Sequence, residues 1–217
     1  MNGSAVWAGI GAQLRRPKGA MGWFVGHAMR LANAQANALA VQALAPQVGE
    51  DILELGCGPG HALRQILALD VGSVTAVDHS RLMIDQARLK NADAVAAGRL
   101  RLYCDDFETL PIDVASVDAV LAVNVAYFMF DEKAIAEACR VLKPCGRLVV
   151  YATSSSAMRN WRFVGPHSHR LFDGADLLAL LKRGGFSDGQ VTLQRVNAGF
   201  GVEGLIATGR RGGIPIG

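Results

Sequence analysis

Long runs of one kind of residue are missing from this sequence. No stretch is rich in lysine or arginine, and the formal net charge is only +3, so a basic tail or stripe for nucleic acid is not indicated. No uninterrupted apolar stretch approaches the roughly 20 residues that cross a bilayer. The first residues lack a basic region followed by an apolar one, so we expect no signal peptide.

Cysteine is also scarce, with four residues among 217. Cys57, Cys104, Cys139 and Cys145 form no CxxC pair and no Cys/His cluster at zinc spacing. They indicate reduced thiols in a cytoplasmic protein rather than a disulfide framework. Hydrophobic residues make up 51% and charged residues 19%, which is typical of a globular chain. The length favours a single domain spanning residues 1–217.

The most informative stretch is residues 51–61, which read DILELGCGPGH. A short apolar run of the length and composition of a buried parallel strand comes first. Three glycines follow at alternating positions, Gly56, Gly58 and Gly60, and apolar residues then recur at helical spacing. A strand that turns through glycines into a helix brings bare backbone and a helix N-terminus up to a ligand. A tight turn without a ligand is the plainer alternative.

Strands and helices alternate along the rest of the chain. The expected strands are 73–77, 100–104, 118–123, 147–152, 190–196 and 204–208, and the expected helices are 81–97, 131–142 and 173–182. This alternation predicts an α/β fold, a doubly wound and mostly parallel seven-stranded sheet. The last two strands have only a short link, so they should form an antiparallel hairpin at one edge.

The N-terminal part, residues 1–48, is expected to be a helical extension or lid. Residues 1–20 are rich in breakers, and residues 21–44 favour one long helix. Its large apolar surface indicates packing against the domain. A lid over a substrate pocket and a face that touches lipid are the alternatives.

Asp78 ends the second expected strand, 22 positions after Gly56. Ligands of a doubly wound sheet lie beyond the carboxyl ends of the strands, where an acid can accept hydrogen bonds from both hydroxyls of a ribose. Dinucleotide enzymes share this arrangement. An NAD-dependent oxidoreductase therefore stays an alternative, although it leaves residues 106–111 and the terminal hairpin without an explanation.

Four segments in order give a more specific signal. They read ELGCGPG at 54–60, DHSRLM at 78–83, DFETLP at 106–111 and RVLKPCGRL at 140–148. Together they resemble the motifs of the class I S-adenosylmethionine-dependent methyltransferases, with Cys145 in place of the family's usual first glycine. LLALLKRGGF at 177–186 is similar to the family's helix before the final hairpin. The resemblance covers about residues 48–210.

The resemblance implies S-adenosyl-L-methionine as the cofactor. Backbone at Gly56–Gly60 would lie against the methionine part, Glu54 would anchor its ammonium directly or through water, and Asp78 would hold the ribose. Met83 would pack on the adenosyl group, as suits a soft and adaptable side chain. The full set of implied cofactor-binding residues is Glu54, Gly56, Cys57, Gly58, Gly60, Asp78, His79, Met83, Asp106, Phe107 and Asn124.

Three of these residues have more specific implied roles. Asp106 would accept from the adenine amino group, and the Phe107 backbone N–H would meet a ring nitrogen. Asn124 would offer its backbone carbonyl to the ammonium. Taken singly, each of these positions is also compatible with a turn or cap residue. No metal site is expected.

The reaction implied by the resemblance is an in-line displacement, for which the protein mainly aligns acceptor, methyl and sulfur. Tyr127 follows the fourth strand, where the family places substrate-facing residues, and is either a wall or a catalytic residue. His167 and His169 lie in the insertion after the fifth strand, and a histidine near neutral pKa suits general-base work. Histidines in a loop with arginines are otherwise often only solvated.

A small-molecule acceptor is favoured, with oxygen, nitrogen and sulfur left open as the methylated atom. Nucleic acid is disfavoured because residues 124–127 read NVAY and lack the paired prolines of enzymes that methylate base amino groups. A lipid or quinone precursor at a membrane surface is a less favoured alternative. A catalytically silent binding protein is another. The oligomeric state is not indicated by the sequence.

Overall fold

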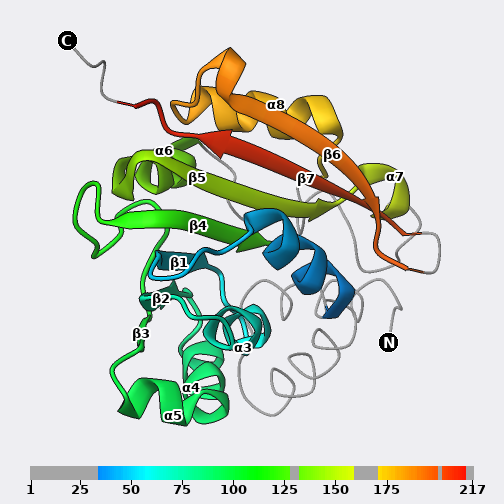
Figure 1. Ribbon diagram of the computed structural model, residues 1–217. Coiled ribbons are helices and arrows are strands. Elements are labelled where there is room, and N and C mark those ends of the chain that lie inside the picture. The colour runs from blue at the N-terminus through cyan, green and yellow to red at the C-terminus, as the bar shows by residue number, and fades with distance from the viewer. Residues whose placement is uncertain (1–33, 128–131, 159–170, 200–201, 214–217) are drawn as a thin grey trace.

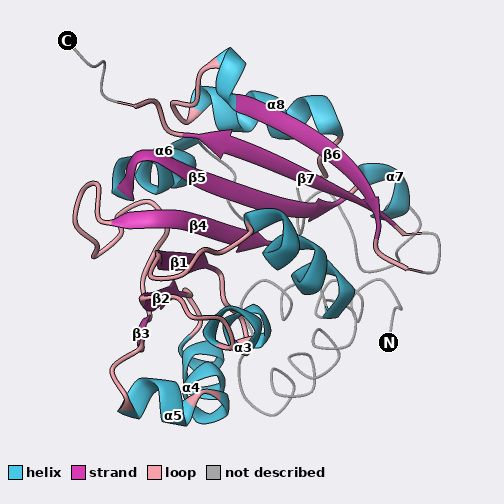
Figure 2. Ribbon diagram, in the orientation of Figure 1, coloured by secondary structure: helices cyan, strands magenta, loops and turns pink. Residues whose placement is uncertain are grey.

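The computed structural model describes residues 34–127, 132–158, 171–199 and 202–213. One seven-stranded sheet runs through the molecule in the order β3-β2-β1-β4-β5-β7-β6. Figures 1 and 2 show helices on both of its faces. The predicted doubly wound α/β fold is confirmed.

The five N-terminal strands run parallel. They are β1 (Asp51–Leu55), β2 (Ser73–Val77), β3 (Leu100–Tyr103), β4 (Val117–Val123) and β5 (Leu142–Thr153). β6 (Val191–Asn197) and β7 (Glu203–Arg210) are antiparallel, and β7 lies between β5 and β6. The predicted antiparallel hairpin at one edge is therefore confirmed. The chain leaves β1 first toward β2 and β3 and later toward β4 and β5, so the switch point lies between β1 and β4.

Two apolar layers cover the sheet. On one face, residues 34–44, which are helical, pack with α3 (His61–Leu67) and α4 (Arg81–Lys90) against alternate residues of β1, β2 and β4. On the other face lie α6 (Glu132–Val141) and α8 (Gly174–Arg183). Successive side chains of a strand point to opposite faces, which is why Ile52 joins one layer and Leu53 the other.

The remaining short elements are α5 (Ala92–Ala96), α7 (Ser155–Met158) and a 3₁₀ turn, η1 (Asp188–Gln190). The single helix predicted for 81–97 is wrong, because the chain breaks at Asn91 between α4 and α5. There Asn91 turns inward, with 7% of its surface exposed, and its side-chain amide donates to the carbonyl of Ala87 at 2.9 Å. This side-chain bond competes with continuation of the helix.

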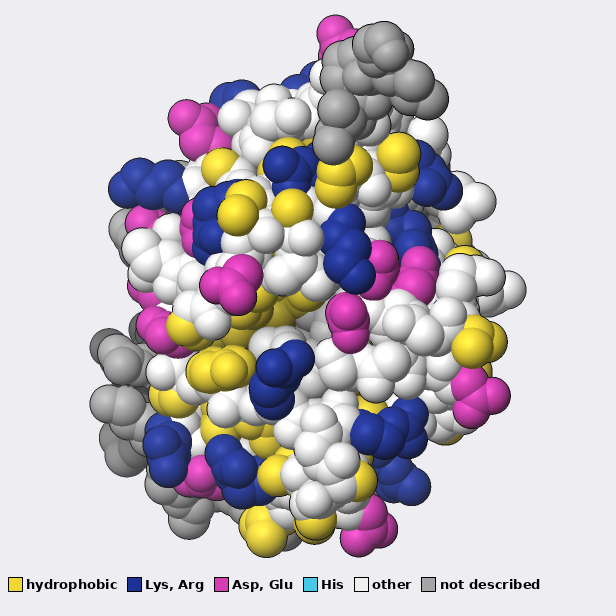
Figure 3. Space-filling view, turned by 60° about the vertical axis from the view of Figure 1, so that its left-hand side comes forward, with side chains coloured by type: hydrophobic (Ala, Val, Ile, Leu, Met, Phe, Trp, Pro, Cys, Tyr) yellow, Lys and Arg dark blue, Asp and Glu magenta, His cyan; other side chains and the backbone are white. Residues whose placement is uncertain are grey.

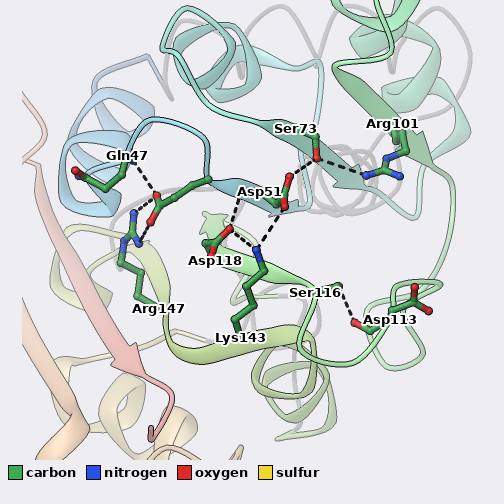
Figure 4. Close-up of polar contacts among 10 residues, drawn as sticks. Gln47, Asp51, Ser73, Arg101, Asp113, Ser116, Asp118, Lys143 and Arg147 are labelled. Carbon is green, nitrogen blue, oxygen red and sulfur yellow. Dashed lines mark hydrogen bonds and ion pairs between the residues drawn. The ribbon is translucent and has the colours of Figure 1, made fainter.

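At the amino ends of the strands, ion pairs hold β1, β4 and β5 together (Figure 4). Lys143 Nζ lies 2.7 Å from Asp118 Oδ2 and 3.5 Å from Asp51 Oδ2. Arg147 makes two hydrogen bonds to Glu50, at 2.6 and 2.7 Å. It also donates to the carbonyl of Leu44 at 2.6 Å. Arg147 thereby fixes the end of the 34–44 helix to β5.

One face of β2 and β3 is left open beside the loop at residues 104–116, all of which are described and none of which is helical. A cavity of about 220 Å³ lies there, and Figure 3 shows this side of the molecule as a hollow with hydrophobic side chains at its bottom and charged ones around it. Its lining includes Ser73, Thr75, Arg101, Tyr103, Asp113 and Ser116. The parts of the chain with described coordinates contain no helix long and apolar enough to cross a membrane.

Candidate cofactor site

The candidate site lies beyond the carboxyl ends of β1, β2, β3 and β4. Gly56 follows β1 directly and donates its N–H to the carbonyl of Val77 in β2 at 2.7 Å. A Cβ built on Gly56 would collide with Val125 and would come within 3.6 Å of Phe107. The segments after β1, β3 and β4 are therefore packed side by side, and only glycine fits at this contact.

All three glycines of the turn adopt positive φ, with 67° at Gly56, 50° at Gly58 and 81° at Gly60. The fold leaves no space for a side chain at Gly60, because a Cβ there would come within 2.7 Å of Asn91 Nδ2. At Gly58, a Cβ would meet no atom of the described residues within 4 Å. Within the described part of the chain, the turn is therefore open at Gly58.

Asp78 is buried with 5% of its surface exposed and joins two motifs. Its Oδ2 accepts from the Gly58 N–H at 2.9 Å, and its Oδ1 accepts from the Ser80 N–H at 2.8 Å. Burial raises the pKa of Asp78, although both amide hydrogen bonds and nearby His79 oppose this. Each carboxylate oxygen has a second lone pair, so the predicted contact with ribose hydroxyls is compatible with these bonds.

Glu54, the last but one residue of β1, is 2% exposed. Its Oε2 is fully buried and has no hydrogen-bond partner among the described residues. Burial, with the neighbouring Asp78 charge, raises the pKa of Glu54 to about 8. A buried polar oxygen without a partner is costly in a finished fold. An ammonium group bound beside the glycine turn would satisfy Glu54, and S-adenosylmethionine carries one.

The side chain of Cys57 is buried within the glycine turn. It is 5% exposed, and burial together with the charges of Asp78 and Glu54 raises the pKa of its thiol. A neutral thiol is a poor nucleophile. This environment suits a packing residue within the turn.

The residues predicted around the adenosyl group lie at the same edge of the sheet. His79 packs edge-on against Phe107, with ring centroids 6.0 Å apart, and its Nδ1 lies 3.9 Å from Asp78 Oδ1. Met83 is 2% exposed in the first turn of α4. The Phe107 N–H already donates to Asp106 Oδ1 at 2.6 Å, so its predicted bond to an adenine nitrogen requires that contact to open.

Asn124 and Tyr127 follow β4. Asn124 has a φ of 55°, and its side-chain oxygen accepts from the Tyr127 hydroxyl at 2.9 Å. Tyr127 is 4% exposed, and burial raises the pKa of its phenol. Its hydroxyl donates to Asn124 Oδ1 at 2.9 Å and lies 3.2 Å from the Thr153 carbonyl oxygen. His167 and His169 lie outside the described residues.

Sequence reasoning did not single out Thr153, which closes this group from the end of β5. Thr153 is 6% exposed, and its backbone N–H donates to the Tyr127 hydroxyl at 2.5 Å. Nothing in the local sequence marks a threonine at a strand end. Thr153 can be identified only from the tertiary structure, because β5 meets the segment after β4 only in the folded sheet. The described part of the chain contains no group of acidic, histidine and cysteine side chains placed to hold a metal.

Comparison with known proteins finds methyltransferases. Residues 52–146 match a family described as "Methyltransferase domain". The O-methyltransferase cnsE of Penicillium expansum is 32% identical over 108 residues, covering 49% of this chain and 39% of that protein. The methyltransferase YdaC of Bacillus subtilis, itself uncharacterized, is 27% identical over 79% of this chain and 90% of its own length.

The curated relatives and the solved structures differ in how much of their length this chain covers. The chain spans 32–40% of the length of the first three curated relatives. One chain of a complex between the Haloferax volcanii Trm112 methyltransferase activator and a methyltransferase has a TM-score of 0.70, with 18% identity and coverage of 98% and 99%. Phosphoethanolamine N-methyltransferase 2 of Haemonchus contortus, solved with S-adenosylhomocysteine, has a TM-score of 0.65, with 16% identity and coverage of 81% and 52%. At these identities the structures show the fold alone. Taken with the motif residues at the strand ends, the family match supports a class I S-adenosylmethionine-dependent methyltransferase domain over residues 52–146.

Proposed function

We propose that this protein transfers a methyl group from S-adenosylmethionine to a small organic acceptor, with oxygen as the methylated atom. The observation that supports the cofactor site best is the buried, unpartnered Oε2 of Glu54 beside the open backbone of Gly58. Bound S-adenosylmethionine supplies a methyl group already activated by its positively charged sulfur. The chain's own part is to hold the ammonium with Glu54 and the ribose with Asp78, and to align the acceptor.

Oxygen is proposed because three relatives named O-methyltransferases are 31–32% identical over 108 residues. Other relatives are named 24-methylenesterol C-methyltransferases and are 27–29% identical. Carbon is therefore a further acceptor atom that the sequence analysis did not consider. The names belong to those proteins, so the acceptor of this chain needs its own test.

The test is an acceptor screen with the purified full chain and S-adenosylmethionine carrying an isotopically labelled methyl group. Phenols, thiols, amines and sterols are offered separately, and labelled product and S-adenosylhomocysteine are measured by mass spectrometry. We expect product with phenols and none with the other classes. Product with sterols or amines alone would overturn the choice of oxygen. Cofactor binding without turnover on any class would support the silent binding protein instead.

General-base work by His167 or His169 stays part of this proposal. Each is replaced by alanine in turn, and turnover is compared with affinity for S-adenosylhomocysteine. A base should lose turnover and its pH dependence while cofactor affinity stays within about twofold. If both variants turn over normally, the proton leaves without help from either histidine.

A second candidate is a lipid acceptor at a membrane surface, favoured by the sterol methyltransferases among the relatives. It involves the proposed extension or lid at residues 1–48, of which 1–33 lie outside the described residues. Residues 34–44 are part of the core, since Ala40 and Leu44 are fully buried. A truncation that tests lipid binding should therefore begin at residue 34 and spare this helix. Vesicle co-sedimentation of the full chain, lost in the truncated one, would support this candidate. If the full chain does not bind vesicles, we propose a single-domain protein, residues 1–217, that works in the cytoplasm.

A further inference from the structure

The cavity beside the 104–116 loop shares no lining residue with the candidate cofactor site. It lies over β1, β2 and β3, on the face of the sheet that α6 and α8 cover further along (Figure 3). Its volume is about 220 Å³. Since one water occupies about 30 Å³ in the liquid, the cavity has room for roughly seven waters or for a small ligand of similar size.

The floor of this cavity is polar. Ser73 and Thr75 share one face of β2, because side chains at alternate positions of a strand point the same way. Arg101 and Tyr103 share that face of the neighbouring β3, where Arg101 is the register partner of Thr75. The opposite face of the same strands is apolar and packs on α3 and α4. A sheet face that helices cover is normally apolar, so this polar face indicates contact with water or with a polar ligand.

The wall opposite the floor is a loop that is fixed to α6. Arg140 of α6 donates to the carbonyls of Ile112 at 3.0 Å and of Leu110 at 3.2 Å. Further along the loop, the Ser116 hydroxyl donates to the carbonyl of Asp113 at 2.7 Å (Figure 4). The loop contains no helix, yet these bonds hold its shape. The cavity is therefore formed in advance, and a ligand would not have to order its wall.

Two opposite charges line the cavity without forming an ion pair with any described residue. They are Arg101 on β3 and Asp113 on the loop (Figure 4). The Arg101 guanidinium donates only to the Ser73 hydroxyl among the described residues, at a long 3.4 Å. Asp51, the other acid in the lining, already accepts from Ser73 at 2.7 Å and lies 3.5 Å from Lys143 Nζ. Arg101 and Asp113 are therefore the charges that a ligand can still pair with.

This pair of charges selects the class of ligand. A simple anion would be attracted by Arg101 and repelled by Asp113, and a simple cation would meet the reverse, whereas a zwitterion brings a counter-charge to each. Ile112 and Val117 also line the cavity, so the body of the ligand should be apolar. We propose that this cavity binds a free aliphatic amino acid, with its carboxylate on Arg101 and its ammonium on Asp113. The site is separate from the proposed methyl transfer and does not depend on it.

Ligand-observed NMR titration of the full chain with leucine tests the site. We expect saturable binding with a dissociation constant below about 10 mM. Isopentylamine lacks the carboxylate of leucine, and isocaproate lacks its ammonium. Each should bind at least about tenfold more weakly than leucine, because each loses one charge-assisted contact. No binding of leucine, or equal binding of either analogue, would show a hollow that holds only water or a nonspecific apolar contact, and would overturn the proposal.

Variants place the probe in this cavity rather than in the cofactor site, which is also expected to take an amino-acid end. Arg101→Gln and Asp113→Asn should each weaken leucine about tenfold without loss of stability in urea, since neither side chain forms an ion pair with a described residue. The controls are Arg81→Gln and Asp85→Asn at an exposed pair on α4, which should keep affinity within about twofold. Leucine should also bind when S-adenosylhomocysteine is saturating. Full displacement by S-adenosylhomocysteine, or normal affinity in both cavity variants, would overturn the proposal.

Discussion

The Gly58 N–H donates to Oδ2 of Asp78 at 2.9 Å, across 20 positions of sequence. This bond joins the glycine turn after β1 to the acid that ends β2. Gly58 and Asp78 belong to separate motifs that were each predicted to bind the cofactor, and in the structure this hydrogen bond connects the two motifs. The carboxylate that is expected to hold the ribose also fixes the loop that is expected to lie against the methionine part.

Asp78→Ala should therefore change stability as well as binding. Two backbone N–H groups, at Gly58 and Ser80, would lose their acceptor, at a cost of about 1–3 kcal/mol in the free energy of unfolding. Affinity for S-adenosylmethionine should fall at least about tenfold, as calorimetry would show. Asp85→Ala is the control, since its pair with Arg81 is largely exposed and is worth at most about 1 kcal/mol. Unchanged affinity in Asp78→Ala would contradict the ribose assignment.

Gly58→Ala should separate cofactor binding from folding. The added methyl group meets no atom of the described residues within 4 Å, so the expected cost is that of a positive φ, about 1–2 kcal/mol. We expect a folded protein that no longer binds S-adenosylhomocysteine tightly. Gly56→Ala is the contrasting variant, because its methyl group collides with Val125 and should lower the melting temperature much more. Normal ligand affinity in Gly58→Ala would show that the open space is not the cofactor's.

Glu54 makes the stability of the ligand-free protein depend on pH. Its pKa is about 8 when folded and near 4.5 in the unfolded chain, so the folded state keeps a proton that the unfolded state releases. The contribution of Glu54 is complete below about pH 4.5 and is lost as the pH rises toward 8. The free energy of unfolding should fall by up to about 1.4 kcal/mol per pH unit within this range.

Urea unfolding of the full chain at pH 5.5 and 7.5 measures this effect. Glu54→Gln removes the titrating group at nearly the same size, so the variant should show a flatter dependence and should be the more stable protein at pH 7.5. Asp78, whose pKa is also raised, acts in the same direction and remains in both proteins. An identical pH dependence in the two proteins would rule out a titrating Glu54.

Arg147→Lys should destabilise the fold by about 2 kcal/mol in urea unfolding. The guanidinium forms two hydrogen bonds with Glu50 and two more with the carbonyls of Leu44 and Ala45, and only 12% of the Arg147 side chain is exposed. Lysine cannot reproduce this fork, and Glu50 would be left poorly paired. Arg81→Lys, at an exposed pair, should change stability by less than about 0.5 kcal/mol. Equal effects of the two substitutions would contradict the structural role of Arg147.

Local patterns determined much of the architecture. The strand predicted at 73–77 has those bounds in the structure, because apolar periodicity and flanking turn residues act over a few positions. The helix predicted for 81–97 was wrong at Asn91, whose side-chain amide bonds the nearby Ala87 carbonyl and lies against Gly60, a contact that only the folded chain provides. Propensity favours a helix there, and a tertiary contact overrides it.

For the site, the sequence alone determined the motif residues, their order and the cofactor they imply. A glycine turn and an acid can be recognised from residue types at fixed spacing. The tertiary structure alone decided how these groups are charged and linked. The raised pKa of Glu54 comes from burial beside Asp78, and the bond between Tyr127 and Thr153 joins the turn after β4 to the end of β5, 26 residues further along the chain. Desolvation and contacts between distant segments exist only once the chain has packed, so no local pattern can encode them.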